Sequence, residues 1–459
     1  MLDALDARVQ HVDLVDAVLD FVMDFDIDDM PDEAVEMAQY FLMDTIAVGV
    51  AGKTYDATDK ALAAAETWGE QGTTRVVGRP GIQLARTSAA FMNGMQIHAL
   101  EWDGLHDPSV VIAMCVPVSA MMAELDHRKV SGKALLAAFV IAIEVGVFFG
   151  GATDVGPRFF RPAVTGLMGA SMAMARLRGF NREQTMNTLG IAYSQASGTM
   201  QAHWEGSMVL PMQIGVAARA AHMAADLAAA GMTGPKDIIN GKFGFFRLFE
   251  DGGDISQLVA SLARPLKVTE MSHKPYPAGR ATQATLTMIR ELNDKHVFQA
   301  SDIESIEVDV PPLVMLLVGR PASVDMSPSY ARLCLRFVAP LMLVDGDVDP
   351  RRFITTAFSD PAITALAEKM TINLDDNPDQ NALGPQKMRI KLYDGTLLTA
   401  QCSEPLGSLE NPLSRTQRND KVRRCFELGL PGADAQPLID ACDDLLALDD
   451  ARVLLDVVA

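Results

Sequence analysis

The sequence predicts a mainly α protein with a large all-helical domain and a smaller α+β domain. Residues 12–263 are rich in Ala, Leu, Met and Val at helical spacing, whereas segments after about residue 266 alternate in polarity as half-buried strands do. The chain has 459 residues, more than the roughly 250–300 at which a single core stops growing. Two domains are therefore expected.

The first domain is expected to consist of helices. Ser131 precedes an apolar run, and residues 181–184 (Asn-Arg-Glu-Gln) have the spacing of a capping box. The most apolar stretch, 134–151, contains Glu144 and is shorter than the roughly 20 residues of a membrane span, so it is predicted to be a buried helix. The clearest helical stripe is formed by Ala34, Met37, Ala38, Phe41, Leu42 and Ile46.

The second domain is expected to contain a sheet and helices. Residues 303–310 alternate apolar and acidic side chains, and 387–393 and 396–402 flank Asp-Gly, which predicts a hairpin with a type I′ turn. Between these strands, 331–345 and 350–369 have helical patterns.

Helical patterns return at 415–428 and 437–448, so we expect this tail to rejoin the first domain. The predicted partition is 1–266 with 405–459 as the helical domain, and 267–404 as the α+β domain.

Charge and cysteine content exclude several classes of protein. The formal net charge of −20 disfavours nucleic acid and anionic membranes as partners. The five cysteines are scattered without C-x-x-C spacing, which argues against a disulfide framework and a zinc site. Residues 1–10 contain charges and no apolar core, so no secretory signal is predicted, and the cytoplasm is the expected location.

The most informative segment is 273–282, which reads His-Lys-Pro-Tyr-Pro-Ala-Gly-Arg-Ala-Thr. Each proline fixes its own φ and favours an extended conformation in the residue before it. Lys274, Tyr276 and Arg280 are thus presented from a constrained backbone. A cation, a phenol and a guanidinium held in this way suit a small anionic ligand.

A second polar cluster spans 98–109. His98 and Glu101 are three residues apart and share a face if the segment is helical, and Asp103, His106 and Asp107 follow. The cluster is interpreted either as part of an active site or as a capped, solvated helix terminus.

Two further segments can likewise be interpreted either as part of a binding site or as purely structural features. Residues 201–207 contain His203, Trp204 and Glu205, which suits a pocket lip or a polar loop between helices. Arg158 and Arg161 flank two phenylalanines. The two arginines are interpreted either as guanidinium groups that bind substrate carboxylates or as surface cations beside a buried phenylalanine.

The sequence contains no metal-binding or phosphate-binding signature. It lacks H-E-x-x-H, an EF-hand loop, G-x-G-x-x-G and a Walker A motif, and its eight histidines are dispersed. We therefore expect no metal and no organic cofactor, and general acid–base catalysis by side chains.

Taken together, these segments resemble the MmgE/PrpD family, which includes 2-methylcitrate dehydratase, cis-aconitate decarboxylase and iminodisuccinate epimerase. The resemblance implies a helical domain, an α+β lid, a homodimer, and an active site between the domains that acts on small di- or tricarboxylates without a cofactor. Its most specific motif is Lys-Pro-Tyr-Pro at 274–277 followed by Arg-Ala-Thr at 280–282; similarity also covers 93–103, 133–146, 161–179, 189–198, 206–218, 231–235 and 341–349.

The chain departs from the decarboxylase and dehydratase members at several polar positions. Glu101 replaces one of their aspartates, whereas Asp103 and Lys274 are kept. Two histidines of those members are replaced here, one among Val110, Val111 and Ile112 and the other at Phe160 or Arg161. Their lysine falls at Leu210, and their lid tyrosine falls near Leu317.

Because of these losses, the favoured hypothesis is a cofactor-independent isomerase or epimerase, or a lyase, that abstracts a proton next to a carboxylate. Motifs at 159–162, 311–312, 317–321 and 329–334 resemble the iminodisuccinate epimerase branch. Lys274 is the expected base, with His106 and Glu101 or Asp103 providing the opposite proton transfer. The candidate substrate-binding residues are Arg161, Arg280, Tyr276, His203, Gln213, Arg320 and Arg332.

Two alternatives remain open. One is a lyase like 2-methylcitrate dehydratase or cis-aconitate decarboxylase. The other is a member that has lost catalysis and binds a metabolite.

Overall fold

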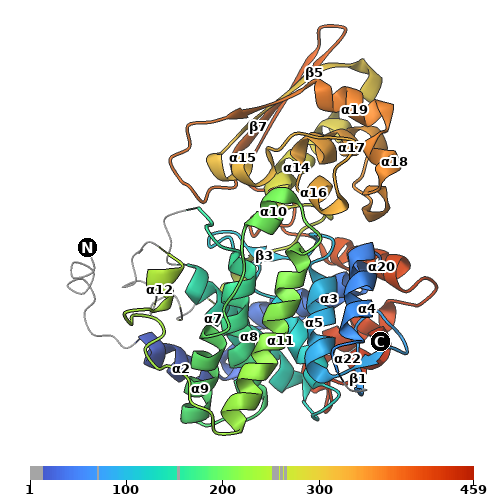
Figure 1. Cartoon of the computed structure of the whole chain (residues 1–459). Helices are drawn as coiled ribbons and strands as arrows, with labels where there is room; N and C mark the ends of the chain where they lie inside the picture. The colour runs from blue at the N-terminus through green and yellow to red at the C-terminus, as the bar shows by residue number, and fades with distance from the viewer. Residues whose placement is uncertain (1–13, 70–71, 152–155, 251–257, 259–261, 263–265) are drawn as a thin grey trace.

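The computed structural model describes residues 14–69, 72–151, 156–250, 258, 262 and 266–459. Residues 1–10, for which no secretory signal is predicted, lie outside these ranges. Figure 1 shows a large helical domain below and a smaller part above it. We call this smaller part, residues 276–402, the lid domain, because its buried apolar side chains form a core of their own. The predicted mainly α fold with a smaller α+β domain is confirmed.

The helical domain is built from both ends of the described chain. The C-terminal helices, red in Figure 1, pack among the N-terminal ones, and Lys421 of the tail forms a buried ion pair with Asp44. Its helices are α2 (Leu14–Asp24), α3 (Asp32–Gly52), α4 (Asp56–Ala65), α5 (Arg86–Ile97), α6 (Cys115–Glu124), α7 (Gly132–Gly150), α8 (Arg161–Leu177), α9 (Arg182–Tyr193), α10 (Gln201–Glu205), α11 (Leu210–Ala229), α12 (Phe245–Leu248), α20 (Arg415–Gly429), α21 (Gln436–Asp443) and α22 (Val453–Val458).

Caps and small residues explain how these helices begin and pack. The Ser131 side chain accepts a hydrogen bond from Ala134 N, and Asn181 and Gln184 form the predicted capping box. A Cβ on Gly169 would lie 2.2 Å from the carbonyl oxygen of Ala142, so only glycine permits α8 to approach α7 this closely.

The helical domain also contains two short antiparallel strand pairs. β1 (Thr74–Arg75) pairs with β2 (Gln83–Leu84). β3 (Leu105–His106) pairs with β4 (Met271–Ser272) in antiparallel register, Leu105 opposite Ser272. This second pair joins the polar cluster at 98–109 to the constrained segment at 273–282.

The lid domain contains a four-stranded sheet in the order β6-β5-β7-β8, in which only the β5–β6 pair is parallel. Along β5, Ile303, Ile306, Val308 and Val310 are buried, as the alternating pattern predicts. The elements are α14 (Gln283–Lys295), β5 (Ile303–Val310), α15 (Pro312–Val318), α16 (Pro328–Arg332), α17 (Leu335–Asp345), α18 (Thr355–Phe358), α19 (Pro361–Glu368), β6 (Met370–Leu374), β7 (Gln386–Leu392) and β8 (Leu397–Cys402).

The predicted hairpin is confirmed, but its turn type is wrong. A type I′ turn needs positive φ at two consecutive residues, and here Gly395 has φ 90° while Asp394 does not have a positive φ. Gly395 N–H instead donates to Leu392 O, which closes a longer loop with glycine in the left-handed position. Three predicted helices are also interrupted: 331–345 becomes α16 and α17, 350–369 becomes a 3₁₀ turn with α18 and α19, and 437–448 ends as α21 at Asp443.

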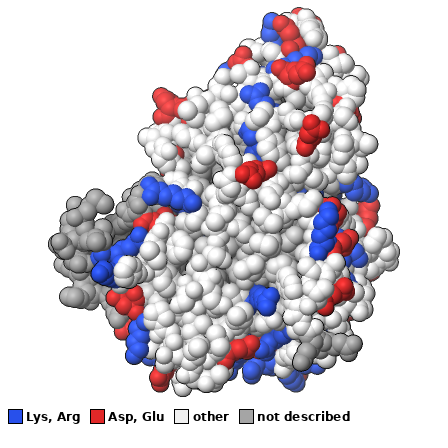
Figure 2. Space-filling model, in the orientation of Figure 1, with Lys and Arg blue, Asp and Glu red and all other residues white. Residues whose placement is uncertain are grey.

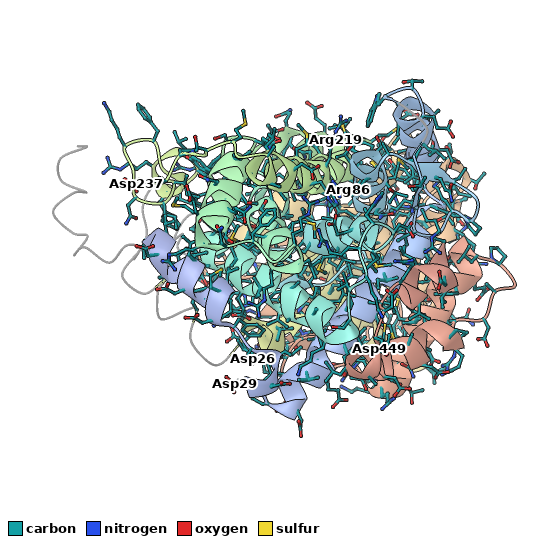
Figure 3. All side chains as sticks on the ribbon, turned by 90° about the horizontal axis from the view of Figure 1, so that it is seen from below. Asp26, Asp29, Arg86, Arg219, Asp237 and Asp449 are labelled. Atoms are coloured by element: carbon teal, nitrogen blue, oxygen red, sulfur yellow. The ribbon has the colours of Figure 1, made fainter. Side chains whose placement is uncertain are left out.

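Charged side chains of both signs lie on the surface (Figure 2), and the two most apolar long helices among the described residues are largely buried. Acidic and basic side chains are interspersed on the face in Figure 2, and Figure 3 shows Asp26, Asp29, Asp237 and Asp449 near the rim of the helical domain. Two described helices, α3 and α7, are long and apolar enough to cross a membrane, but 78% and 89% of their most apolar windows are buried inside the protein. They are core helices; location in the cytoplasm stays a prediction.

Candidate active site

A pocket lies between the two domains, beyond the C-terminal end of α5. It contains about 660 Å³ outside the protein atoms, including the part open to solvent. Five predicted site residues line it: Glu101, Lys274, Arg161, Arg280 and His203. The rest of its wall is largely apolar, with Leu105, Ile112 and Phe160 from the helical domain and Leu317, Val318 and Leu383 from the lid domain.

The segment that carries Lys274 is fixed on several sides. His273 stacks on Phe41 with ring centroids 4.1 Å apart, and the indole N–H of Trp102 donates to Pro275 O over 3.1 Å. Tyr276, predicted to face the ligand, is instead buried in the lid core and does not line the pocket. The prolines constrain the backbone, but the phenol ring packs with the apolar residues of the lid.

Four charged groups meet at the pocket wall. The Lys274 ammonium donates to the Glu101 carboxylate over 3.3 Å and to its backbone carbonyl over 3.2 Å, and lies 3.8 Å from Asp103. His98 Nε2 lies 3.3 Å from the other oxygen of Glu101, and His98 Nδ1 lies 2.9 Å from Asp103. Because these groups are buried, the alternative of a solvated helix terminus at 98–109 is excluded.

The backbone at Glu101 is held in an uncommon conformation. Its φ is 53°, in the left-handed region that non-glycine residues rarely occupy. A Cβ on Gly104 would lie 2.6 Å from Ser272 O, so the loop after Glu101 packs directly against β4. Such strain persists only where the surroundings enforce it and is frequent at active sites.

Neighbouring charged groups shift the pKa values of His98 and Asp103. Burial alone would lower the pKa of His98, but Asp103 and Glu101 raise it above its ordinary value. Burial would likewise raise the pKa of Asp103, but His98 and Lys274 lower it. His98 therefore favours the imidazolium form and Asp103 the carboxylate.

His106, the predicted partner of Lys274, is not among the residues that line the pocket. Its Nδ1 lies 2.8 Å from Ser109 Oγ and its Nε2 lies 3.0 Å from Glu270. The hydrogen bond from His106 lowers the pKa of Glu270 to about 2. Both ring nitrogens are thus engaged on the far side of β3, and the structure does not bring His106 to face Lys274.

Two arginines line the pocket with different partners. Arg280 forms a bidentate pair with Asp107, at 2.8 and 2.6 Å. Arg161 lies 3.6 Å from Glu250 and donates to Asn381 of the lid domain over 3.4 Å. Burial lowers the pKa of Arg161, but a guanidinium stays charged at physiological pH.

The remaining candidates surround the pocket without lining it. The Arg332 guanidinium lies between the rings of Tyr55 and Phe353, at 5.0 and 4.8 Å. The side-chain amide of Gln213 accepts a hydrogen bond from Thr199 N–H and donates one to the Thr199 carbonyl. Arg320 contacts the pocket residue His203 and is considered below.

Comparisons with known proteins cover nearly the whole chain. The MmgE/PrpD N-terminal domain matches residues 16–258, and the MmgE/PrpD C-terminal domain matches residues 276–445. The chain belongs to the MmgE/PrpD family. Among its relatives, the cis-aconitate decarboxylase of Homo sapiens is 28% identical over 440 residues, which cover 93% of this chain and 90% of the relative. The cis-aconitate decarboxylase of Aspergillus terreus is 26% identical over 412 residues, 83% of each chain.

The MmgE/PrpD resemblance predicted from the motifs is thereby confirmed, and the chain is an MmgE/PrpD-type isomerase or lyase. Its assignment to the epimerase branch stays a prediction. Of the apolar replacements predicted from the resemblance, Val110, Ile112, Phe160 and Leu317 line the pocket. Leu210 is buried but does not line it.

Several site residues of this MmgE/PrpD enzyme were missed by sequence reasoning. His98 was noted for its spacing but not selected; its relation to Asp103 depends on a loop, not on helical periodicity. Asn381 and Glu250 reach Arg161 from distant parts of the chain, and no local pattern marks them. Within the described ranges, no three His, Cys, Asp or Glu side chains gather as metal ligands; the absence of a metal or cofactor stays a prediction.

Proposed function

We propose that this enzyme transfers a proton at a carbon atom next to a carboxylate of a small di- or tricarboxylate, with Glu101 as the base. The observation that carries the proposal is the position of the Glu101 carboxylate at the pocket wall, 3.3 Å from both His98 and Lys274. Contacts with these two groups fix the orientation of the carboxylate before the substrate arrives.

This geometry changes the proposed role of Lys274. The Lys274 amine already donates to the carboxylate and the backbone carbonyl of Glu101 and lies 3.8 Å from Asp103, an arrangement that suits a hydrogen-bond donor and anion-holding group. We therefore assign the base to Glu101 and the cation to Lys274.

The charge of the pocket supports a carboxylate substrate. Lys274, Arg161 and Arg280 all line it, although the whole chain carries a formal charge of −20. Arg280 is held by Asp107 in a close bidentate pair, at 2.8 and 2.6 Å. The contacts of Arg161 with Glu250 and of Lys274 with Glu101 are longer, at 3.6 and 3.3 Å, so we propose that Arg161 and Lys274 hold substrate carboxylates.

The first step breaks the C–H bond. The proton moves to Glu101, and the electron pair delocalises into the adjacent carboxylate, where Lys274 and Arg161 stabilise the added negative charge. Return of a proton to the opposite face gives an epimer, whereas cleavage of a C–O bond with protonation of the leaving hydroxide gives a dehydrated product. In a decarboxylation a C–C bond breaks instead of the C–H bond and CO₂ leaves. Glu101 then abstracts no proton, and the carbon atom takes up a proton for which Lys274 is the donor at the pocket wall.

Lyase chemistry has the stronger support from relatives, since the cis-aconitate decarboxylases align with most of this chain. We propose cis-aconitate as the first substrate to test. An isomerase acting on an iminodisuccinate-like substrate is the second candidate. It is favoured by the apolar wall at Val110, Ile112 and Leu317, where a lyase would need a proton donor.

The test is incubation of the protein in D₂O with cis-aconitate, 2-methylcitrate and an iminodicarboxylate of the iminodisuccinate type, followed by NMR. A lyase gives a new product and an epimerase gives deuterium at the carbon next to the carboxylate. Tight binding without exchange or product would support the inactive binder and contradict the proposal.

A further inference from the structure

His203 lies where α10 meets the lid domain. Figure 1 shows α10 directly below the lid, next to α16. Arg320 of the lid donates from Nη1 to the His203 carbonyl over 3.0 Å and from Nη2 to His203 Nδ1 over 3.3 Å. Arg320 is itself fixed, because it donates to Leu317 O over 3.0 Å and stacks on Tyr330 at 4.8 Å.

The chemistry of arginine settles the tautomer of this histidine. A guanidinium carries only donors, so His203 Nδ1 must accept and therefore has no hydrogen. The neutral ring then carries its hydrogen on Nε2. A second proton would place N–H against N–H across this contact, which disfavours the imidazolium form.

The surroundings of His203 act in the same direction. Burial, with Arg320 next in size, lowers the pKa of His203 to about 4. His98 and Lys274 also lower it, and Glu101 is the group that opposes them. His203 and Glu101 line the same pocket, from different elements of the helical domain.

We propose that His203 is a neutral hydrogen-bond donor for the substrate, which Arg320 of the lid domain holds in the Nε2–H tautomer. This rests on the proposed function. When Glu101 takes the proton and the electron pair moves into the adjacent carboxylate, Nε2–H donates to the oxygen that gains charge. His203 itself neither gains nor loses a proton, and Arg320 acts only through it, as a positioning residue.

The contact also ties the donor to the docked lid. Ser327 of the lid donates to the carbonyl of Gly206, directly after α10, and a Cβ on Gly206 would lie 2.4 Å from Tyr330. The lid thus holds both ends of the turn that carries His203. Arg320 can therefore hold His203 in the Nε2–H tautomer only when the two domains are in contact.

The tautomer is tested without any substrate. Histidine-selective ¹⁵N labelling of the full chain gives signals from eight histidines, and those of His203 are identified by their loss in His203→Gln. We expect the neutral Nε2–H form from about pH 8 down to about pH 5, below the ordinary histidine value of about 6.5. A hydrogen on Nδ1, or a charged ring at about pH 7, would overturn the proposal.

Arg320→Met removes the donor to Nδ1, whereas Arg320→Lys keeps one. In Arg320→Met, His203 becomes free to change tautomer, and its pKa rises only part of the way towards the ordinary value because burial, His98 and Lys274 still lower it. Arg320→Lys stays close to wild type. The exposed Arg351→Met, on the same domain, is the control and leaves the His203 signals unchanged.

Turnover separates this proposal from the proposed function. His203→Ala should lower kcat by about 10²- to 10³-fold, as loss of an oxyanion donor does, and His203→Gln should retain part of the rate through its amide N–H. The kcat of Arg320→Met relative to wild type should rise as the pH falls from about 8 towards the partly raised pKa of His203 in this variant, because protonation restores the hydrogen on Nε2. A ratio independent of pH contradicts the role of Arg320. If wild-type protein has the expected tautomer but turns over no carboxylate, the proposed function fails and the tautomer assignment stands.

Discussion

Lys274 Nζ lies 3.3 Å from the carboxylate of Glu101, although the two residues are 173 positions apart in the sequence. The contact joins the loop that follows α5 to the segment that leads into the lid domain. Both side chains are buried at the pocket wall, so neither charge can be removed without consequence for the other.

Glu101→Gln is expected to lower proton exchange, and any epimerisation or dehydration that depends on it, by about 10²- to 10⁴-fold, because the amide cannot accept the substrate proton. Rates of deuterium incorporation measured by NMR test this. The control is Glu205→Gln, an exposed carboxylate near the pocket that pairs with Gln201 on its own helix. An undiminished rate in Glu101→Gln would exclude Glu101 as the base.

Lys274→Met is expected to destabilise the fold by about 3–5 kcal/mol, since it leaves Glu101 and Asp103 as buried carboxylates without their ammonium partner. Urea unfolding followed by circular dichroism measures the change. Lys60→Met removes the exposed pair with Asp56, and should leave the free energy of unfolding close to that of wild type. Equal effects of the two substitutions would contradict a buried ion pair at Lys274.

Glu144 gives a pH-dependent prediction. Burial raises its pKa to about 8, and the hydrogen bond from Val268 N does not offset this. A raised pKa in the folded state means that the associated stability is fully present below the ordinary value of 4.5 and is lost as the pH rises towards 8. Glu144→Gln is neutral at every pH, so it should be more stable than wild type by about 3 kcal/mol near pH 7, and by little near pH 4.5.

Unfolding free energies of both proteins across this pH range provide the measurement. A difference that does not change with pH would mean that Glu144 is ionised in the folded protein.

Gly169→Ala should destabilise the helical domain by about 1–3 kcal/mol, because the added methyl group meets the carbonyl of Ala142 at 2.2 Å. Gly69→Ala is the matched control, since a Cβ there has no neighbour within 4 Å. Thermal unfolding of the two variants compares them directly. If Gly169→Ala unfolds at the wild-type temperature, α7 and α8 are not as close as described.

Local sequence patterns predicted the parts of the fold that local forces determine. The stripe in α3, the cap at Asn181 and the β7–β8 hairpin all depend on neighbouring residues, and all are present. The predicted turn type at Gly395 was wrong because Asp-Gly is compatible with more than one loop length, and loop length selects the turn type.

The site was predicted less completely, for a physical reason. Lys274 and Glu101 could be recognised as chemically capable residues, but their partners come from other elements. His106 is turned towards Glu270, which lies 164 positions away, and Tyr276 is buried by the lid core. Neither outcome depends on neighbouring residues, so spacing alone could not predict it.

The buried contact of Lys421 bears on how the enzyme is made. Its ammonium donates to the carbonyl of Trp102 over 2.9 Å, and Trp102 separates Glu101 from Asp103. The proposed base is therefore held in place by a helix that leaves the ribosome more than three hundred residues later. During translation the helices of the first half can form, but the pocket wall stays incomplete until α20 has been synthesised and docks. A chain interrupted before Lys421 would thus contain every proposed catalytic group and still lack the contact that orders them.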